Sequence, residues 1–77
     1  MDRAKAELRL RILEYIESNE MPHFFKIAKD LHIHSDTLAE ELKTLIDQGY
    51  LVVYEGGYYS LTQEGLAEMN QLKEAHN

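Results

Sequence analysis

Three consecutive residues of this chain, His34, Ser35 and Asp36, have the side-chain types of a hydrolytic triad. A working triad needs side chains that converge from different parts of a fold, and neighbours at the start of a helix cannot converge in this way. We therefore interpret His34 or Ser35 as the residue that begins a helix. The sequence predicts no catalytic residue, and we expect a protein that is not an enzyme.

The histidines are the only candidate metal ligands of the kind that zinc prefers. His32 and His34 are separated by one residue, with His23 and His76 farther away along the chain. A zinc site needs three or four protein ligands, and nothing nearby supplies a convincing third. We expect these histidines to be exposed in a turn, and we predict neither a metal site nor a cofactor.

The pair Gly56-Gly57 has the composition of a phosphate-binding loop but lacks its other parts. Such a loop needs a Lys-Ser or Lys-Thr ending and a helix after it, whereas a strand pattern follows here. The two glycines instead predict a two-residue turn in a β-hairpin, because both central residues of such a turn can require positive φ.

Helical patterns surround this hairpin and must position the residues above. Apolar side chains recur at helical spacing over residues 4–18, over a helix expected from Pro22 to Leu31, and from Ser35 onward. Gly49 is placed to end the third helix, and Thr62 is placed to cap a fourth. Glu7 and Arg11 are four residues apart on the first helix, which favours an ion pair.

The hairpin alternates between two faces. One face is expected to hold Leu51, Val53, Tyr59 and Leu61, and the other Val52, Tyr54, Tyr58 and Ser60. Tyr54 and Tyr58 flank the turn and are predicted to pair across the strands. Because an isolated two-stranded hairpin is marginal in water, we expect it to lie against the helices.

Length and composition predict one domain over residues 1–77. The chain has no cysteine, which excludes disulfides and cysteine-based zinc sites, and it has no apolar run long enough to span a membrane. The charged N-terminal sequence lacks the apolar core of a signal peptide, so we expect a cytoplasmic protein.

Three segments carry a family resemblance. IAKDLHI (27–33) resembles the second helix and turn of a helix-turn-helix motif, and TLAEELKTLIDQGYL (37–51) resembles the recognition helix and its exit. YYSLTQEG (58–65) is similar to the Tyr-x-Leu-Thr-x-x-Gly ending of winged helix-turn-helix transcription regulators of bacteria and archaea. The resemblance implies a mainly α fold with a small β-hairpin: three helices, a two-stranded wing and a C-terminal helix.

The resemblance also implies a DNA-binding transcription regulator that reads double-stranded DNA. The third helix would enter the major groove, with the wing beside it. The residues expected to contact nucleic acid are Lys26, Lys29, His34, Ser35, Asp36, Ala39, Glu40, Lys43, Thr44, Gly56 and Gly57. Further candidates for phosphate contacts are Arg3, Lys5, Arg9 and Arg11.

The charge favours a second interpretation. The chain has 14 Asp and Glu against 8 Lys and Arg, for a formal net charge of −6. DNA-binding domains are usually basic, and Glu40 and Glu41 stand where Arg, Lys or His are common in the resembling family. The alternative is a winged-helix module that binds another protein and not DNA.

The last helix suggests self-association. Its apolar stripe consists of Leu66, Met69 and Leu72. Members of the resembling family often dimerise through terminal helices, so this stripe is the expected interface of a homodimer.

Overall fold

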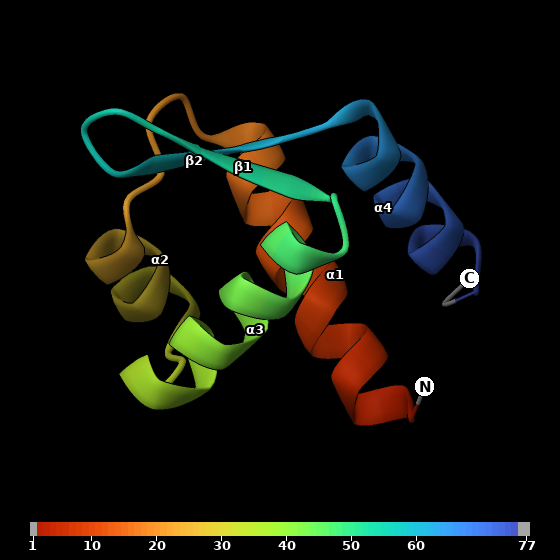
Figure 1. The fold of residues 1–77 in the computed structure, drawn as a ribbon. Helices are drawn as coiled ribbons and strands as arrows, with labels where there is room; N and C mark the ends of the chain where they lie inside the picture. Colours follow the sequence, from red (N-terminus) through yellow and green to blue (C-terminus); the bar gives the residue numbers. More distant parts are fainter. Residues whose placement is uncertain (1, 76–77) are drawn as a thin grey trace.

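The computed structural model describes residues 2–75, which form four helices and one antiparallel two-stranded sheet (Figure 1). In chain order the elements are α1 (Arg3–Ser18), α2 (Phe24–Leu31), α3 (Ser35–Asp47), β1 (Leu51–Tyr54), β2 (Tyr58–Leu61) and α4 (Gln63–Ala75). The mainly α architecture with a small hairpin agrees with the sequence-based prediction.

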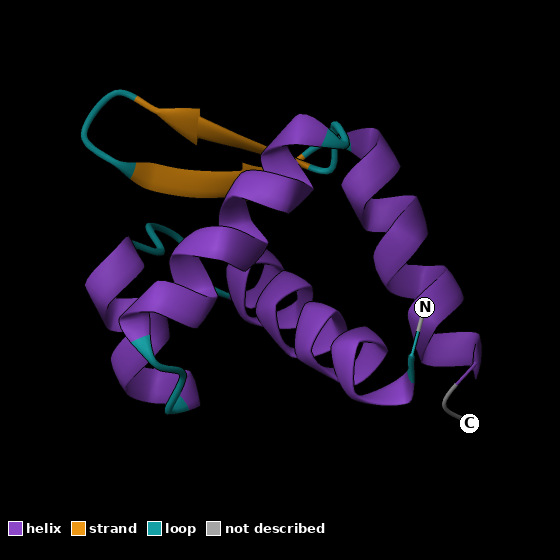
Figure 2. Cartoon of the chain, turned by 60° about the horizontal axis from the view of Figure 1, so that its bottom comes forward, coloured by secondary structure: helices purple, strands orange, loops and turns teal. Residues whose placement is uncertain are grey.

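Helix α1 is the centre of the fold. It packs against α4 on one side and α2 on the other, and β2 lies across it (Figure 1). The hydrophobic core draws from every helix and from β1, and it contains Ile12, Leu13, Ile16, Ile27, Leu38, Leu42, Leu45, Leu51 and Met69. Figure 2 shows the hairpin at one edge of the molecule, beside the helical layer.

The second helix begins later than predicted. Pro22 and His23 are not helical: the backbone N–H of Tyr59 donates to the Pro22 carbonyl oxygen at 3.1 Å, and His23 forms a β-bridge with Tyr58. The prediction that Pro22 begins the helix was wrong because Pro also suits extended backbone, and pairing with β2 selects that state. The chain therefore enters α2 from the sheet.

The turn between α2 and α3 depends on a left-handed residue. His32 has φ 55° and ψ 47°, and the N–H of Ile33 donates to the Ala28 carbonyl at 3.0 Å. Histidine is among the residues that adopt this region more often than most. His34 then caps α3, since its Nδ1 accepts a hydrogen bond from the Asp36 N–H at 3.2 Å.

The hairpin loop holds three residues. Tyr54 pairs with Tyr58, so Glu55, Gly56 and Gly57 all lie in the loop, and the predicted two-residue turn was one residue too short. Both glycines do have positive φ, 96° and 83°. The pairing of Leu51 with Leu61 and of Val53 with Tyr59 places these four side chains on one face, as the alternation predicted.

Thr62 joins the end of α3 to the start of α4. Its Oγ1 donates to the Gly49 carbonyl at 2.6 Å and accepts from the Gly65 N–H at 2.9 Å. The predicted capping role of Thr62 is confirmed. Over residues 2–75, none of the helices has both the length and the apolar character needed to cross a membrane.

Candidate nucleic-acid interface

Helix α3 has one buried face and one open face. Leu38, Leu42 and Leu45 point into the core. The six α3 residues expected to contact DNA are all exposed on the other side of the helix; we call them the α3 outer face, and they are Ser35, Asp36, Ala39, Glu40, Lys43 and Thr44. This separation follows from the helical period of the leucines.

The charges of the α3 outer face are mostly negative. Asp36 and Glu40 lie on it, and Asp47 continues it by one turn. Lys43 Nζ is 2.8 Å from Asp47 Oδ2, and this carboxylate raises the pKa of Lys43 by accepting its hydrogen bond. Lys43 therefore remains a cation, with much of its charge balanced by its neighbour.

Helix α2 has two exposed lysines. Lys26 and Lys29 are exposed, and Lys26 Nζ is 3.4 Å from Asp30 Oδ2. Asp30 also accepts a hydrogen bond from the Tyr15 hydroxyl at 2.6 Å. Exposed ion pairs of this kind contribute little and exchange readily, so a phosphate can replace Asp30 as the partner of Lys26.

The hairpin is aromatic and carries no basic side chain. No Lys or Arg occurs between Lys43 and Lys73, and Glu55 precedes the exposed Gly56 and Gly57. The rings of Tyr54 and Tyr58 are 5.5 Å apart, which confirms the predicted cross-strand pair. The hairpin therefore offers a phosphate only backbone groups and hydroxyls.

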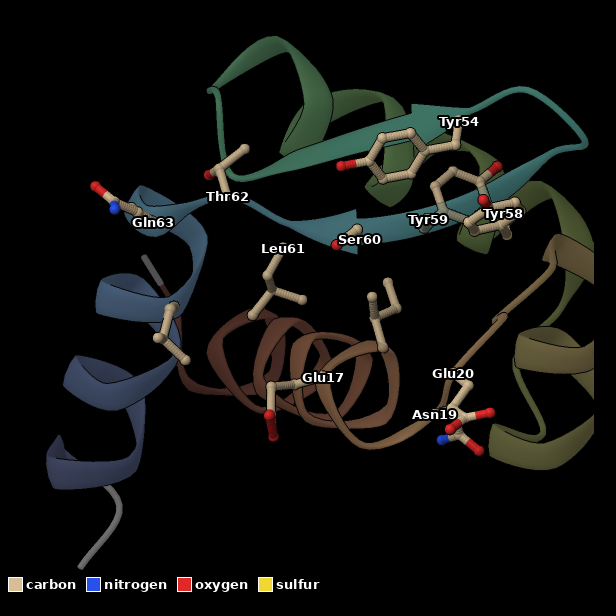
Figure 3. A pocket seen from close by; sticks show the side chains of 12 residues that line it. Glu17, Asn19, Glu20, Tyr54, Tyr58, Tyr59, Ser60, Leu61, Thr62 and Gln63 are labelled. Carbon is tan, nitrogen blue, oxygen red and sulfur yellow. The ribbon is translucent and has the colours of Figure 1, made fainter.

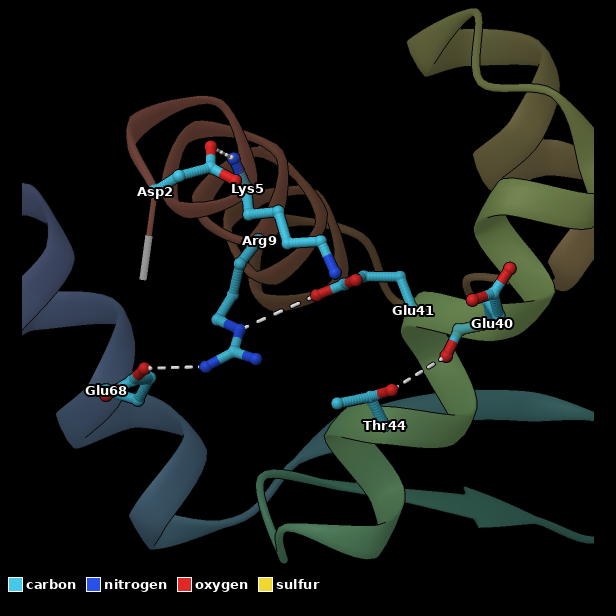
Figure 4. A network of polar contacts seen from close by, with 7 residues as sticks. All are labelled: Asp2, Lys5, Arg9, Glu40, Glu41, Thr44 and Glu68. Carbon is cyan, nitrogen blue, oxygen red and sulfur yellow. Dashed lines mark hydrogen bonds and ion pairs between the residues drawn. The ribbon is translucent and has the colours of Figure 1, made fainter.

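Arg9 is not available for a phosphate contact. It is only 7% exposed, and its guanidinium joins three helices (Figure 4). Nη1 is 3.1 Å from Glu68 Oε2 on α4, and Nε is 3.6 Å from Glu41 Oε1 on α3. Glu41 is thus turned inward, and only Glu40 of the two consecutive glutamates faces outward.

A sequence signal for this cluster was present. Arg9 precedes Ile12, Leu13 and Ile16 by three, four and seven residues, which places it on the buried stripe of α1. The two glutamates that pair with it are remote in sequence, so their role required the tertiary structure. The cluster fixes how α3 and α4 are held against α1.

The other N-terminal arginines also have partners. Arg3 pairs with Glu7 at 3.6 Å, and Arg11 Nη2 donates to the Leu31 carbonyl oxygen at 2.6 Å. The predicted pair of Glu7 with Arg11 was therefore wrong: the C-terminus of α2 attracts Arg11, because the last carbonyls of a helix lack backbone donors.

Part of the apolar stripe of α4 is buried in the core of the same chain. Met69 is 4% exposed in the core, and Leu72 packs against that core, whereas Leu66 is 44% exposed. Of the three residues expected at a dimer interface, Leu66 has the largest surface free for a partner.

A pocket of about 420 Å³ lies away from the α3 outer face (Figure 3). It is formed by the end of α1, the hairpin and the start of α4, with Glu17, Glu20, Tyr58 and Leu66 among the lining residues. No residue of α3 lines this pocket, so it is separate from the candidate interface.

The histidines do not assemble a metal site in the described part of the chain. Among residues 2–75, no group of three or more His, Cys, Asp or Glu could hold a metal ion. His34 Nδ1 faces Asp36 and its own helix start. His76 lies outside the described residues.

The chain is similar to known proteins both in sequence family and in fold. Residues 2–77 match the winged helix-turn-helix family. Among solved structures, the transcriptional repressor CouR is similar with a TM-score of 0.81 and 21% sequence identity, over 92% of this chain and 55% of that one. The chain thus spans about half the length of that repressor, and at this identity the likeness concerns the fold. No curated protein sequence matches the chain.

Proposed function

Since this chain belongs to the winged helix-turn-helix family, we propose that it is a small DNA-binding transcriptional regulator. In this proposal α3 enters the major groove of duplex DNA, and the wing, the β1–β2 hairpin, lies beside the backbone. The observation that carries the proposal is the α3 outer face, which the rest of the fold leaves uncovered along the helix.

The side chains on this face are suited to close approach. Ser35, Ala39 and Thr44 are short, so the helix can lie deep in a groove, and hydroxyls bind either donors or acceptors on base edges. Glu40 can accept a hydrogen bond from the amino group of cytosine. Lys26, Lys29 and Lys43 supply the phosphate contacts.

The net charge of −6 makes this binding weak. Three lysines per chain are few, and each phosphate contact adds a slope of roughly −0.9 to the logarithm of affinity against the logarithm of salt concentration. Binding to random duplex is therefore expected only at low salt.

Two substitutions on α3 test the proposal. Lys43→Ala removes one phosphate contact and should weaken binding at low salt about three- to tenfold. Glu40→Gln removes a charge that repels phosphate and should strengthen binding to random duplex. Fluorescence anisotropy with a labelled duplex measures both.

The matched controls are Lys73→Ala and Glu74→Gln on α4, which change the net charge of the chain by the same amounts. If each control alters the affinity for duplex DNA as much as its α3 counterpart, the change in affinity results from the net charge of the chain. In that case α3 is not the DNA-binding helix.

A second candidate function is a winged-helix module that binds a protein. The acidic residues Asp36, Glu40 and Asp47 along α3 favour this function, since they match a basic protein surface better than a phosphate backbone. If at low salt this chain binds duplex DNA no more tightly than it binds an unrelated acidic protein, the second function replaces the first.

A further inference from the structure

The wing has one free strand edge. The sheet contains only β1 and β2 among the described residues, and the far side of β2 is met by the bridge between His23 and Tyr58. The outer edge of β1 therefore has no neighbouring strand (Figures 1 and 2). Its backbone N–H and C=O groups on that side are open to another chain.

Apart from the short length of β1, four residues, this edge lacks the features by which proteins prevent strand pairing. Soluble proteins place Lys, Pro or a bulge on such edges. Here Val52, Val53 and Tyr54 follow one another with exposed fractions of 38%, 51% and 51%, in a strand whose register with β2 is regular. Three consecutive exposed apolar residues on an open edge favour association.

The distribution of charge along the sequence indicates which partner can approach the free edge of β1. Glu55 is the one Asp, Glu, Lys or Arg between Asp47 and Glu64, while the whole chain has a formal net charge of −6. Two copies of the chain repel one another over most of their surfaces. The wing is the region where they can approach without bringing like charges together.

We propose that the free edge of β1 pairs with the same edge of a second copy, antiparallel about a two-fold axis, to form a four-stranded sheet. Opposite residues of an antiparallel pair point their side chains to the same face, so the axis must relate one residue to its own copy. Centred on Val53, the pairing places each Val53 opposite the other copy's Val53 and each Val52 opposite the other copy's Tyr54. The two Glu55 side chains then lie at opposite ends of the new strand pair. This association does not depend on DNA binding.

The competing contact is Leu66 on α4, the stripe residue of that helix with the largest free surface. Its exposed fraction of 44% is close to the 51% of Val53, so the two positions form a matched pair. A lysine at either position lowers the net negative charge equally. Any difference between the two variants therefore reports the place of contact and not total charge.

Sedimentation velocity over a series of protein concentrations tests the proposal. The parent should show a reversible monomer–dimer equilibrium. Val53→Lys should weaken the dimer roughly tenfold, because the lysine is placed near the axis in both copies. Leu66→Lys should leave the dimer within about twofold of the parent, since α4 lies outside the new strand pair.

Amide hydrogen exchange of the parent provides a readout that needs no variant. Protection of the β1 amides should rise with protein concentration, and protection of the α4 amides should not. A parent that stays monomeric at millimolar concentration overturns the proposal. So does a dimer that Leu66→Lys weakens as much as Val53→Lys, or one whose concentration-dependent protection lies on α4.

Discussion

Gly65 is required by the close approach of two backbone segments. It is buried where the first turn of α4 crosses Tyr50, and a Cβ atom there would collide with the Tyr50 carbonyl oxygen. That oxygen also accepts the Thr62 N–H at 3.1 Å, so it cannot move without breaking the entry to α4. Gly65→Ala should therefore destabilise the fold by about 2–3 kcal/mol in urea unfolding.

The direction of this effect is informative, because helix propensity alone predicts the opposite. Replacing glycine by alanine inside a helix normally stabilises it by up to about 1 kcal/mol. The control is Ala67→Gly, at an exposed position of the same helix, which should cost about that amount. A Gly65→Ala variant as stable as the parent would show that α4 does not cross Tyr50 in this way.

The Tyr15–Asp30 hydrogen bond links α1 to α2 and gives the stability a pH dependence at both extremes. Desolvation, together with the hydrogen bond to Asp30, raises the pKa of Tyr15 to about 12. The same hydrogen bond, helped by Lys26, lowers the pKa of Asp30 below its ordinary 3.8. The contribution of Tyr15 is complete below pH 10.0 and is lost as pH rises toward 12.

The contribution of Asp30 has the opposite sign. It is complete above pH 3.8 and is lost as pH falls through the lowered pKa. Thermal melts of the parent and of Tyr15→Phe should differ by a constant amount near neutral pH, and the difference should shrink above pH 10.0 and below pH 3.8. A difference that stays constant across both ranges would mean that the hydrogen bond is not formed in solution.

At the scale of elements, helical periodicity predicted most of the architecture. The apolar stripe of α3 identified both its buried leucines and, by exclusion, its outer face. The start of α2 was predicted incorrectly because the local sequence at Pro22 permits both a helix and an extended strand. Pairing with Tyr59, far along the chain, decides between them.

The electrostatic part of the site was less predictable than the fold. Arg9 was expected near phosphate, but Glu41 and Glu68 hold it among α1, α3 and α4. Such a cluster joins residues distant in sequence, and a burial pattern alone does not reveal which acids complete it. Because Glu41 points inward to Arg9, the α3 outer face has one negative charge fewer than the sequence suggests.

The wing loop offers a test at the same scale. Gly56 and Gly57 both have positive φ, which β-branched residues resist. Replacing both by Val should destabilise the hairpin by about 1–3 kcal/mol per position and lower the thermal midpoint. Glu55→Val is the control, since Glu55 shares the loop but not the positive φ. A double variant that melts with the parent would contradict the loop geometry.

For the whole molecule, the distribution of charge separates two surfaces. The wing has Glu55 as its one charged side chain, whereas the helices have charges of both signs, with acids in excess on the α3 outer face as well, and Lys26 and Lys29 lie on α2. We therefore propose that α3 and α2 bind DNA and that the edge of β1 mediates self-association. These assignments are independent and can fail separately.

The most direct test of the central claim is to map duplex DNA onto the labelled protein by NMR at low salt. We expect chemical-shift changes to concentrate on the amides of Lys29, of His34 and of the α3 outer face, and to vanish as salt is raised. Changes confined to α4 or to the outer edge of β1, or no changes at all at low salt, would contradict the claim that α3 binds DNA.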